Sequence, residues 1–310
     1  MIRRLLQAIP AIVGVTLVVF LLIHATGDPA LIFLGHDATP ERIALFNKAY
    51  GLDKPLYVQY GLFLFHVIQG DFGTSIIQGR PVIEVILNYL PRTVILALVS
   101  TTIGLLVGMT AGIIAGWKRN SIFDYLLMLG SVLGQSAAQF WLGLMLMLVF
   151  AVKLGWLPTS GTGSGLVSIK YLILPVLTLT PWFLALTARL VRSGMLEVMR
   201  QDYIRTAYAK GLSQWLVITR HAFRNALIPL VTMTGLNLAV LVGGAVIVEI
   251  LFAWPGIGFL AYMSVLHRDY PVVLGVVTMV AVVFITVNIL VDIILAYIDP
   301  RIRLTGGKAQ

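Results

Sequence analysis

Residues Val94–Trp117 read VILALVSTTIGLLVGMTAGIIAGW and contain no aspartate, glutamate, lysine or arginine. A helix needs about 20 predominantly apolar residues to cross the hydrocarbon core of a bilayer. This stretch exceeds that length and carries none of the charged side chains that hydrocarbon excludes. It therefore predicts a transmembrane helix.

Five other stretches also lack all four charged residue types. They are Leu5–Ile23, Tyr125–Val152, Tyr171–Ala188, Ala226–Val248 and Pro271–Val291. The stretch Tyr171–Ala188 is short and contains Pro175 and Pro181, so we expect a kinked helix that extends toward Leu190. Of all residues, 59% are hydrophobic and 11% are charged, whereas roughly 25% are charged in a soluble domain. We predict an all-α polytopic membrane protein with six transmembrane helices.

The basic residues indicate the orientation of these helices. If the N-terminus is cytoplasmic, most of the 22 lysines and arginines fall on the cytoplasmic side. They lie there in short segments, which carry the most weight in membrane topology. We therefore predict that both termini are inside, and we assign the net charge of +9 to topology rather than to nucleic-acid binding.

The longest segment outside the charge-free stretches lies between Leu5–Ile23 and Val94–Trp117. Turn residues recur in it, and aromatic residues are interleaved between the turns. We expect a small external subdomain. The predicted division is residues 1–27 for an N-terminal transmembrane helix, 28–92 for the external subdomain, 93–300 for a five-helix membrane core with a cytoplasmic loop at 189–225, and 301–310 for a cytoplasmic tail.

The chemistry of the side chains argues against an enzyme. The chain has no cysteine, which excludes disulfides, thiol nucleophiles and Cys-based metal sites. It contains no phosphate-binding loop, no H-E-x-x-H helix and no G-x-S-x-G nucleophile elbow. Its five histidines are scattered along the chain. We predict no catalytic residue and no metal site.

Glycines recur every four residues within Val94–Trp117, at Gly104, Gly108, Gly112 and Gly116. This spacing places all four on one face of a helix. Small residues at that spacing let two membrane helices approach closely. We predict a helix-packing role for them, in preference to a role in lining a pore.

Ionisable residues within the membrane are candidate functional residues, because hydrocarbon disfavours charge. This chain has few, and the two that stand out are Glu249 and Asp292, both near the ends of predicted spans. A structural role and a functional role both remain open for them. Such scarcity argues against an ion-driven carrier, so the energy for any transport is expected to come from elsewhere.

The cytoplasmic loop contains a segment with helical composition, Glu197–Lys210. Met199, Ile204, Ala207 and Tyr208 share roughly one side of the predicted helix, away from the charged residues. Gly211 is typical of a residue that ends a helix. We predict a short amphipathic surface helix on a basic cytoplasmic face.

The same loop carries a family motif. It reads DYIRTAYAKG from Asp202 to Gly211 and then HAFRNALIP from His221 to Pro229. This pattern resembles the EAA-type loop of binding-protein-dependent ABC transporter permeases. The usual Glu-Ala-Ala start is replaced by Arg205-Thr206-Ala207, which is typical of the peptide, opine and nickel branch.

Other segments resemble the same branch over nearly the whole chain. They are GDPA from Gly27, GLDKPLYVQYG from Gly51, GDFGTSI from Gly70, GRPV from Gly79, LGWLP from Leu154, EILFAWPGIG from Glu249, DYP from Asp269 and DPRI from Asp299. Together they are similar to the first of the two permease subunits of dipeptide, oligopeptide and glutathione importers.

The resemblance implies an importer of the bacterial cytoplasmic (inner) membrane with several partners. They are a second homologous permease, two cytosolic ATPases that bind ATP and magnesium, an external substrate-binding protein and membrane lipid. The chain itself is expected to bind no cofactor. The resemblance also implies that the surface helix couples to an ATPase through Asp202, Tyr203, Arg205, Thr206, Ala207, Lys210 and Gly211.

Peptides are the leading substrates implied by the resemblance, with glutathione, nickel complexes and opines as alternatives. No substrate-binding residues are identified.

The basic residues Arg192, Arg200, Arg220 and Arg224 are expected to pair with acidic ATPase residues or with anionic lipid headgroups. A hypothesis of another class is a stand-alone carrier or channel, which predicts inverted repeats and coupling-ion residues at the midplane. The sequence shows neither.

Overall fold

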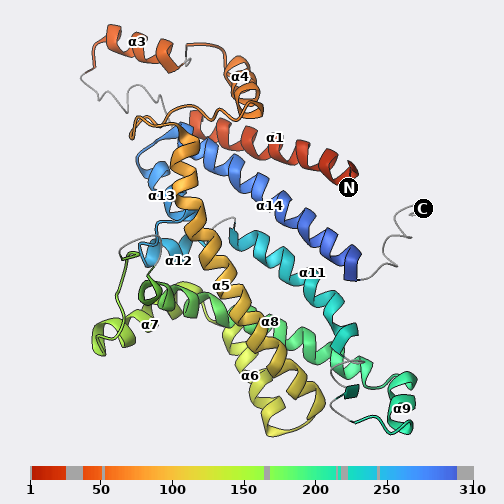
Figure 1. The fold of residues 1–310 in the computed structure, drawn as a ribbon. Coiled ribbons are helices and arrows are strands. Elements are labelled where there is room, and N and C mark those ends of the chain that lie inside the picture. Colours follow the sequence, from red (N-terminus) through yellow and green to blue (C-terminus); the bar gives the residue numbers. More distant parts are fainter. Residues whose placement is uncertain are drawn as a thin grey trace. The chain divides into compact units, whose positions relative to one another are not determined.

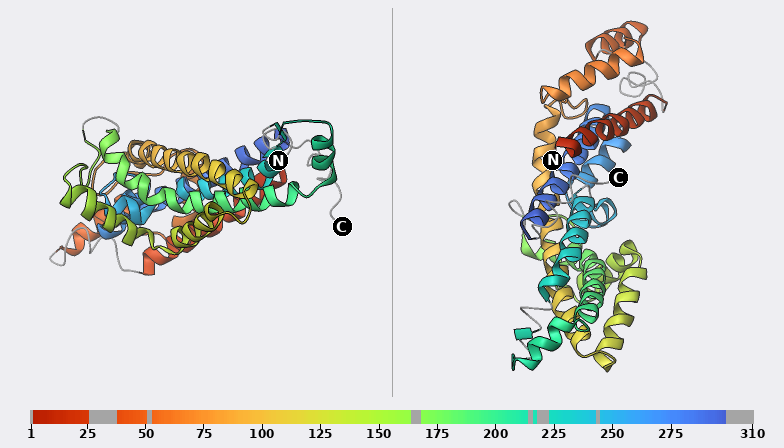
Figure 2. Two further views of the ribbon diagram at one scale, coloured as in Figure 1. Left: turned by 90° about the horizontal axis from the view of Figure 1, so that it is seen from below. Right: turned by 90° about the vertical axis from the view of Figure 1, so that its right-hand side faces the viewer.

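The protein is built from helices (Figures 1 and 2). A computed structural model describes residues 2–25, 38–50, 53–163, 168–213, 216–217, 223–242 and 245–298. No strand occurs within these ranges, which hold one isolated bridge between Thr74 and Pro81. The helices are α1 (Ile2–Ala25), α3 (Pro40–Tyr50), α4 (Leu56–Ile68), α5 (Val82–Trp117), α6 (Ile122–Ser136), α7 (Gln139–Leu146), the π-helix η1 (Met147–Lys153), α8 (Ile169–Val198), α9 (Asp202–Ala209), α11 (Phe223–Val242), α12 (Val246–Leu251), α13 (Ile257–Leu266) and α14 (Tyr270–Ile298).

The chain forms two compact units. Unit 1 contains residues 1–93 and 255–285, and unit 2 contains residues 94–254 and 286–310. Helices α5 and α14 each contribute residues to both units. The predicted division at residues 27, 92 and 300 stays a prediction.

Unit 1 is held together by two apolar clusters. In the first, the start of α5 packs against α13 and α14 through Val82, Val85, Ile86, Ile257, Leu260, Val272 and Val276. In the second, α1 packs against α14 through Phe20, Ile23, Val273 and Leu274, with Tyr60 and Phe63 of α4 beside them. The helices α1 and α4 and the start of α5 therefore share a core with α13 and α14, which lie far later in the sequence.

A buried aspartate fixes the loop before α5. Asp269 lies in the turn that precedes α14, and its carboxylate accepts hydrogen bonds from the Ser75 hydroxyl and from the Ile76 N–H, the latter at 3.2 Å. Ser75 Oγ in turn accepts the N–H of Gln78 at 2.9 Å. The segments GDFGTSI and DYP, which are far apart in the sequence, thus meet in one hydrogen-bonded junction.

The first turn of α13 depends on a threonine of α5. The Ile257 N–H donates to Thr93 Oγ1 at 2.7 Å, and both residues are buried. Because this N–H belongs to the first helical turn, it has no carbonyl partner within its own helix. Thr93 therefore acts as a cap supplied by another helix.

We predict that Thr93→Val lowers the free energy of unfolding by about 2 kcal/mol, because it leaves a buried N–H without an acceptor. Thr93→Ser keeps the hydroxyl and serves as the control. Denaturant titration of the purified chain in detergent micelles measures the difference. Equal stability of the valine and serine variants would show that the cap contributes nothing.

Unit 2 contains a close helix pair built on the glycine ladder of α5. A Cβ atom added at Gly104 would lie 2.6 Å from Phe183 Cβ, and one at Gly108 would lie 2.8 Å from the Leu184 carbonyl oxygen. At Gly112 it would lie 2.6 Å from the Ala188 carbonyl oxygen, and at Gly116 it would lie 2.7 Å from Met195 Cβ. All four glycines therefore face α8, so the two backbones lie closer than any side chain would allow.

Three described helices are long and apolar enough to cross a membrane. They are Val82–Trp117, Ile169–Val198 and Tyr270–Ile294. A fourth candidate is the pair Ile122–Ser136 and Gln139–Lys153, which bends by 101°. These four correspond to four of the six charge-free stretches.

The structure differs from the sequence-based expectation in two of the six stretches. Tyr125–Val152 is not one straight helix, because Ala137 and Ala138 adopt extended backbone angles between α6 and α7. Ala226–Val248 contains the end of α11 at Val242 and the start of α12 at Val246. Ala245, directly before α12, has a non-helical ψ of 56°. In both stretches the hydropathy is continuous across residues with non-helical backbone angles.

Candidate docking helix

The predicted surface helix corresponds to α9. Helix α8 ends at Val198, and the Gln201 N–H donates to the Val198 carbonyl at 3.0 Å in the turn that follows. The Ile204 N–H then donates to the Gln201 carbonyl at 3.1 Å, which begins α9. The predicted helix 197–210 is therefore the last residues of α8, a turn and α9.

One face of α9 is anchored in the core of unit 2. Ile204 is 1% exposed and Ala207 is 6% exposed. They pack in one cluster with Met195 of α8 and Leu230 of α11. Figures 1 and 2 show α9 beyond the ends of α8 and α11. The short helix is thus fixed to two longer helices by its apolar side.

The opposite face of α9 is polar and exposed. Asp202 and Thr206 are exposed, and the Tyr203 side chain is 42% exposed. Lys210, directly after the helix, is also exposed. The side chains of Arg205 and Tyr208 lie outside the described residues. Of the seven predicted coupling residues, Ala207 therefore serves as an anchor, and at least four point away from the core.

Gly211 ends α9 in a left-handed conformation. Its φ is +77°, a value that favours glycine because other residues meet steric strain there. The Leu212 N–H reaches back to the Ala207 carbonyl at 3.3 Å, and Leu212 packs against the cluster that contains Ala207. This hydrogen bond and this apolar contact together form a Schellman motif.

We predict that Gly211→Ala weakens this helix end by about 1 kcal/mol, because alanine is strained at positive φ. Nothing lies within 4 Å of the added Cβ, so the effect is conformational and not a clash. Hydrogen exchange of the Leu212 amide should accelerate about fivefold. Gly211→Asn is the control, since asparagine tolerates this region better. Unchanged exchange in the alanine variant would contradict the assignment.

A buried ion pair lies on α8 close to this helix. The Arg192 guanidinium donates to both carboxylate oxygens of Asp124 on α6, through Nε and through Nη2, the latter at 2.8 Å. Asp124 is 2% exposed and the Arg192 side chain is 22% exposed. Asp124 also accepts the N–H of Asn120 at 3.1 Å. The pair ties the start of α6 to α8 one turn before Met195.

The expectation that Arg192 pairs with an ATPase or with lipid is therefore wrong, because its partner is Asp124 of the same chain. Arg200 is exposed in the turn before α9. Arg220 and the side chain of Arg224 lie outside the described residues. A signal for the ion pair existed in the sequence, since Asp124 is an isolated acid next to an apolar stretch, but nothing local connected it to Arg192.

The two membrane-proximal acids lie in different surroundings. Glu249 is fully buried on α12, and Asp292 lies in the last third of α14. Their roles stay open. Within the described residues, no three histidine, aspartate or glutamate side chains gather as a metal site would require.

Two family models cover most of the chain. Residues 108–304 match the inner membrane component of binding-protein-dependent transport systems. Residues 1–97 match the N-terminal part of the membrane component of the same systems.

Relatives are similar over nearly their full length. The dipeptide transport system permease protein DppB of Alkalihalophilus pseudofirmus is 42% identical, over 97% of this chain and 98% of the relative. The glutathione transport system permease protein GsiC of Salmonella typhimurium is 44% identical, over 97% of each chain. A putative peptide transport system permease of Brucella abortus is 40% identical, over 97% of this chain and 98% of the relative.

A solved structure supports the fold. A chain of the inward-facing MetNI methionine ABC transporter aligns with a TM-score of 0.57 at 17% identity, over 70% of this chain and 97% of that chain. The family matches, the long apolar helices and this structural likeness agree with one another. The chain belongs to the family of inner membrane components of binding-protein-dependent transport systems, and it is a multi-pass protein of the inner membrane.

Proposed function

We propose that this chain is a permease subunit of an ATP-driven importer of di- and oligopeptides. The similarity to a dipeptide permease and to a putative peptide permease supports this substrate class. In this proposal the chain forms half of the translocation pathway, and a second homologous permease forms the other half. An external binding protein delivers the peptide, and two cytosolic ATPases hydrolyse ATP with magnesium.

The proposal includes six membrane spans with both termini in the cytoplasm. Three long helices and the bent pair supply four of them. Helix α1, with 24 residues, supplies another. Helix α11, with 20 residues, supplies the last together with α12. The basic residues of the segments between the spans support the orientation.

The observation that carries the coupling role is that α9 has one buried face and one exposed face. Its inner face is fixed by Ile204 and Ala207 to the ends of α8 and α11. Its outer face offers Asp202, Tyr203 and Thr206. A partner that grips the outer face would therefore move α8 and α11, because the inner face does not slide freely against a packed core. This is the mechanical property that coupling to an ATPase requires.

Substitution on the outer face of α9 tests this role. We expect Thr206→Arg to abolish co-purification of the ATPases and peptide uptake, because a bulky charge is placed in the docking surface. Membrane insertion and hydrogen exchange of the α9 amides should stay unchanged. Thr159→Arg, at another exposed threonine outside α9, is the matched control and should retain uptake. Normal uptake by an inserted Thr206→Arg chain, or by a chain lacking Asp202–Gly211, would contradict the coupling role.

Glutathione is the second candidate substrate, because a glutathione permease is 44% identical over nearly the whole chain. Glutathione is itself a tripeptide-like anion, so the same pathway could accept both classes. Nickel complexes and opines are the remaining alternatives. A stand-alone carrier is the alternative of another class, and it would transport without any ATPase partner.

A further inference from the structure

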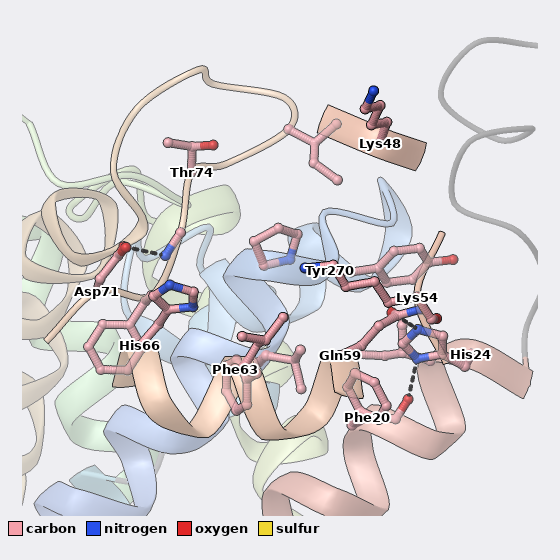
Figure 3. A pocket seen from close by; sticks show the side chains of 17 residues that line it. Phe20, His24, Lys48, Lys54, Gln59, Phe63, His66, Asp71, Thr74 and Tyr270 are labelled. Atoms are coloured by element: carbon pink, nitrogen blue, oxygen red, sulfur yellow. Dashed lines mark hydrogen bonds between the residues drawn. The ribbon is translucent and has the colours of Figure 1, made fainter. Parts of the chain in front are cut away.

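A pocket of about 520 Å³ lies within unit 1 (Figure 3). Its walls come from α1, α3, α4, the loop that includes Asp71–Thr74, and the start of α14. Small-molecule sites in proteins occupy roughly 300–1,000 Å³. The pocket is therefore large enough for a small ligand.

The negative and positive side chains of the pocket lie at opposite ends of it. Figure 3 shows Asp71 at one end, near Thr74 and His66, and Lys54 at the other end, near His24. Lys48 also lines the pocket, but its amine points away from Lys54 in Figure 3. The two lysines and Asp71 are exposed, so they can meet a ligand that arrives from solvent. A ligand with a cationic and an anionic end would be complementary to this arrangement.

The floor between the two ends is apolar. Phe20 and Leu274 are buried there, and Phe63 lies between Asp71 and Lys54 in Figure 3. Apolar side chains with a few polar groups at fixed positions are typical of small-molecule sites. The floor suits the side chains of a small ligand and not a second charged group.

Hydrogen bonds hold the Asp71 carboxylate at one end and the Lys54 backbone at the other. Asp71 Oδ1 accepts the N–H of Gly73 at 2.8 Å. At the other end, Gln59 Nε2 donates to the Lys54 carbonyl at 2.7 Å, and Gln59 Oε1 is 3.1 Å from Nε2 of His24. These bonds order the polar walls before a ligand enters, which reduces the entropy lost on binding.

The wall of the pocket also holds a buried hydroxyl. Tyr270 lines the pocket, and its hydroxyl oxygen is buried with no hydrogen-bond partner among the described residues. Buried polar atoms in native structures almost always have a partner, which includes bound ligands and water. This oxygen has almost no accessible surface, so a ligand would reach it only after the Tyr270 side chain moves.

We infer that this pocket binds a short peptide as a zwitterion, with its ammonium group at Asp71 and its carboxylate at Lys54. The inference rests on the proposed function and assigns to this subunit a peptide site of its own. Zwitterionic lipid headgroups share the ammonium and anion chemistry, so the experiment must separate them from peptides.

The experiment measures equilibrium binding of labelled dialanine to the full chain in nanodiscs of phosphatidylglycerol, which carries no ammonium group. Competing ligands are N-acetyl-dialanine and dialanine amide, each of which removes one terminal charge. We expect saturable binding of dialanine and at least about tenfold weaker binding of each blocked form, as loss of a charged hydrogen bond predicts.

Substitutions in the pocket test which of its ends binds the ammonium group and which binds the carboxylate of the dipeptide. Asp71→Asn should weaken dialanine binding and remove the discrimination against N-acetyl-dialanine. Lys54→Gln should do the same for dialanine amide. Glu84→Gln and Arg80→Gln are matched controls, because both residues are exposed in unit 1 but do not line the pocket. Their affinity should be unchanged.

Several outcomes would overturn the inference. They are absent binding, equal binding of free and blocked dialanine, or discrimination that survives in the pocket variants. A loss of dialanine binding in phosphatidylethanolamine nanodiscs would identify a lipid headgroup site instead. Dialanine uptake by the intact importer is measured in parallel. Uptake without binding to this chain overturns the inference alone, whereas binding without uptake of any peptide overturns the proposed function.

Discussion

Gly112→Leu is expected to lower the free energy of unfolding by about 3 kcal/mol or more, because overpacking a tight contact is destabilising. A Cβ at Gly112 would lie 2.6 Å from the Ala188 carbonyl oxygen and 2.8 Å from Val191 Cβ. The first of these atoms belongs to the backbone of α8, so a change of side-chain rotamer cannot relieve the clash. Helices α5 and α8 would have to separate along the whole glycine ladder.

Denaturant titration in detergent micelles measures this loss, and Gly130→Leu is the matched control. Gly130 lies in the apolar helix α6, and nothing lies within 4 Å of an added Cβ. Its replacement should not lower the stability, because nothing clashes and leucine favours the helix more than glycine does. Equal effects at the two glycines would show that the ladder does not hold α5 against α8.

Asp124→Asn is expected to lower the free energy of unfolding by about 3 kcal/mol, because it leaves the partly buried Arg192 without a counter-charge. Asp124 is almost fully buried and binds the guanidinium through both oxygens. The substitution keeps the size of the side chain, so the loss reports on charge and hydrogen bonding and not on packing.

A double-mutant cycle isolates the pair. Adding Arg192→Gln to Asp124→Asn should restore most of the lost stability, because the unpaired charge is removed. The same denaturant titration measures all four chains. Strictly additive losses in the double variant would contradict the ion pair.

The long helices were predictable because hydropathy reports directly on the solvent that a segment meets. Val94–Trp117 lies within α5, and Pro271–Val291 lies within α14. A kinked helix extending toward Leu190 was predicted around Pro175 and Pro181. Both prolines lie inside α8, which runs on to Val198, and the kink stays a prediction. Helical composition and Gly211 likewise located α9 and its end, since capping is a local property of the chain.

The bend between α6 and α7 was not predictable in the same way. It occurs at Ala137 and Ala138, and alanine is the best helix former. The non-helical Ala245 before α12 likewise lies within a charge-free stretch. Hydropathy alone does not report such breaks, because the apolar character of the stretch continues through them.

The ion pair and the pocket depend on tertiary structure. Arg192 and Asp124 are far apart in the sequence, and a basic loop offers many equivalent partners. The pocket combines Lys54, Asp71 and Tyr270, each of which is unremarkable in its local sequence. Only the packing of α1, α4 and α14 in unit 1 places them around one cavity.

Uptake by cells that lack this chain tests the account most directly. Labelled dipeptide, a longer peptide, glutathione and a nickel complex are compared, with and without the chain and its permease and ATPase partners. We predict that peptide uptake is lost, and that it returns only when this chain and its ATPase partners are all present. Uptake that returns with this chain alone, without any ATPase, would contradict an ATP-driven importer, and restored glutathione or nickel uptake without peptide uptake would contradict the substrate class.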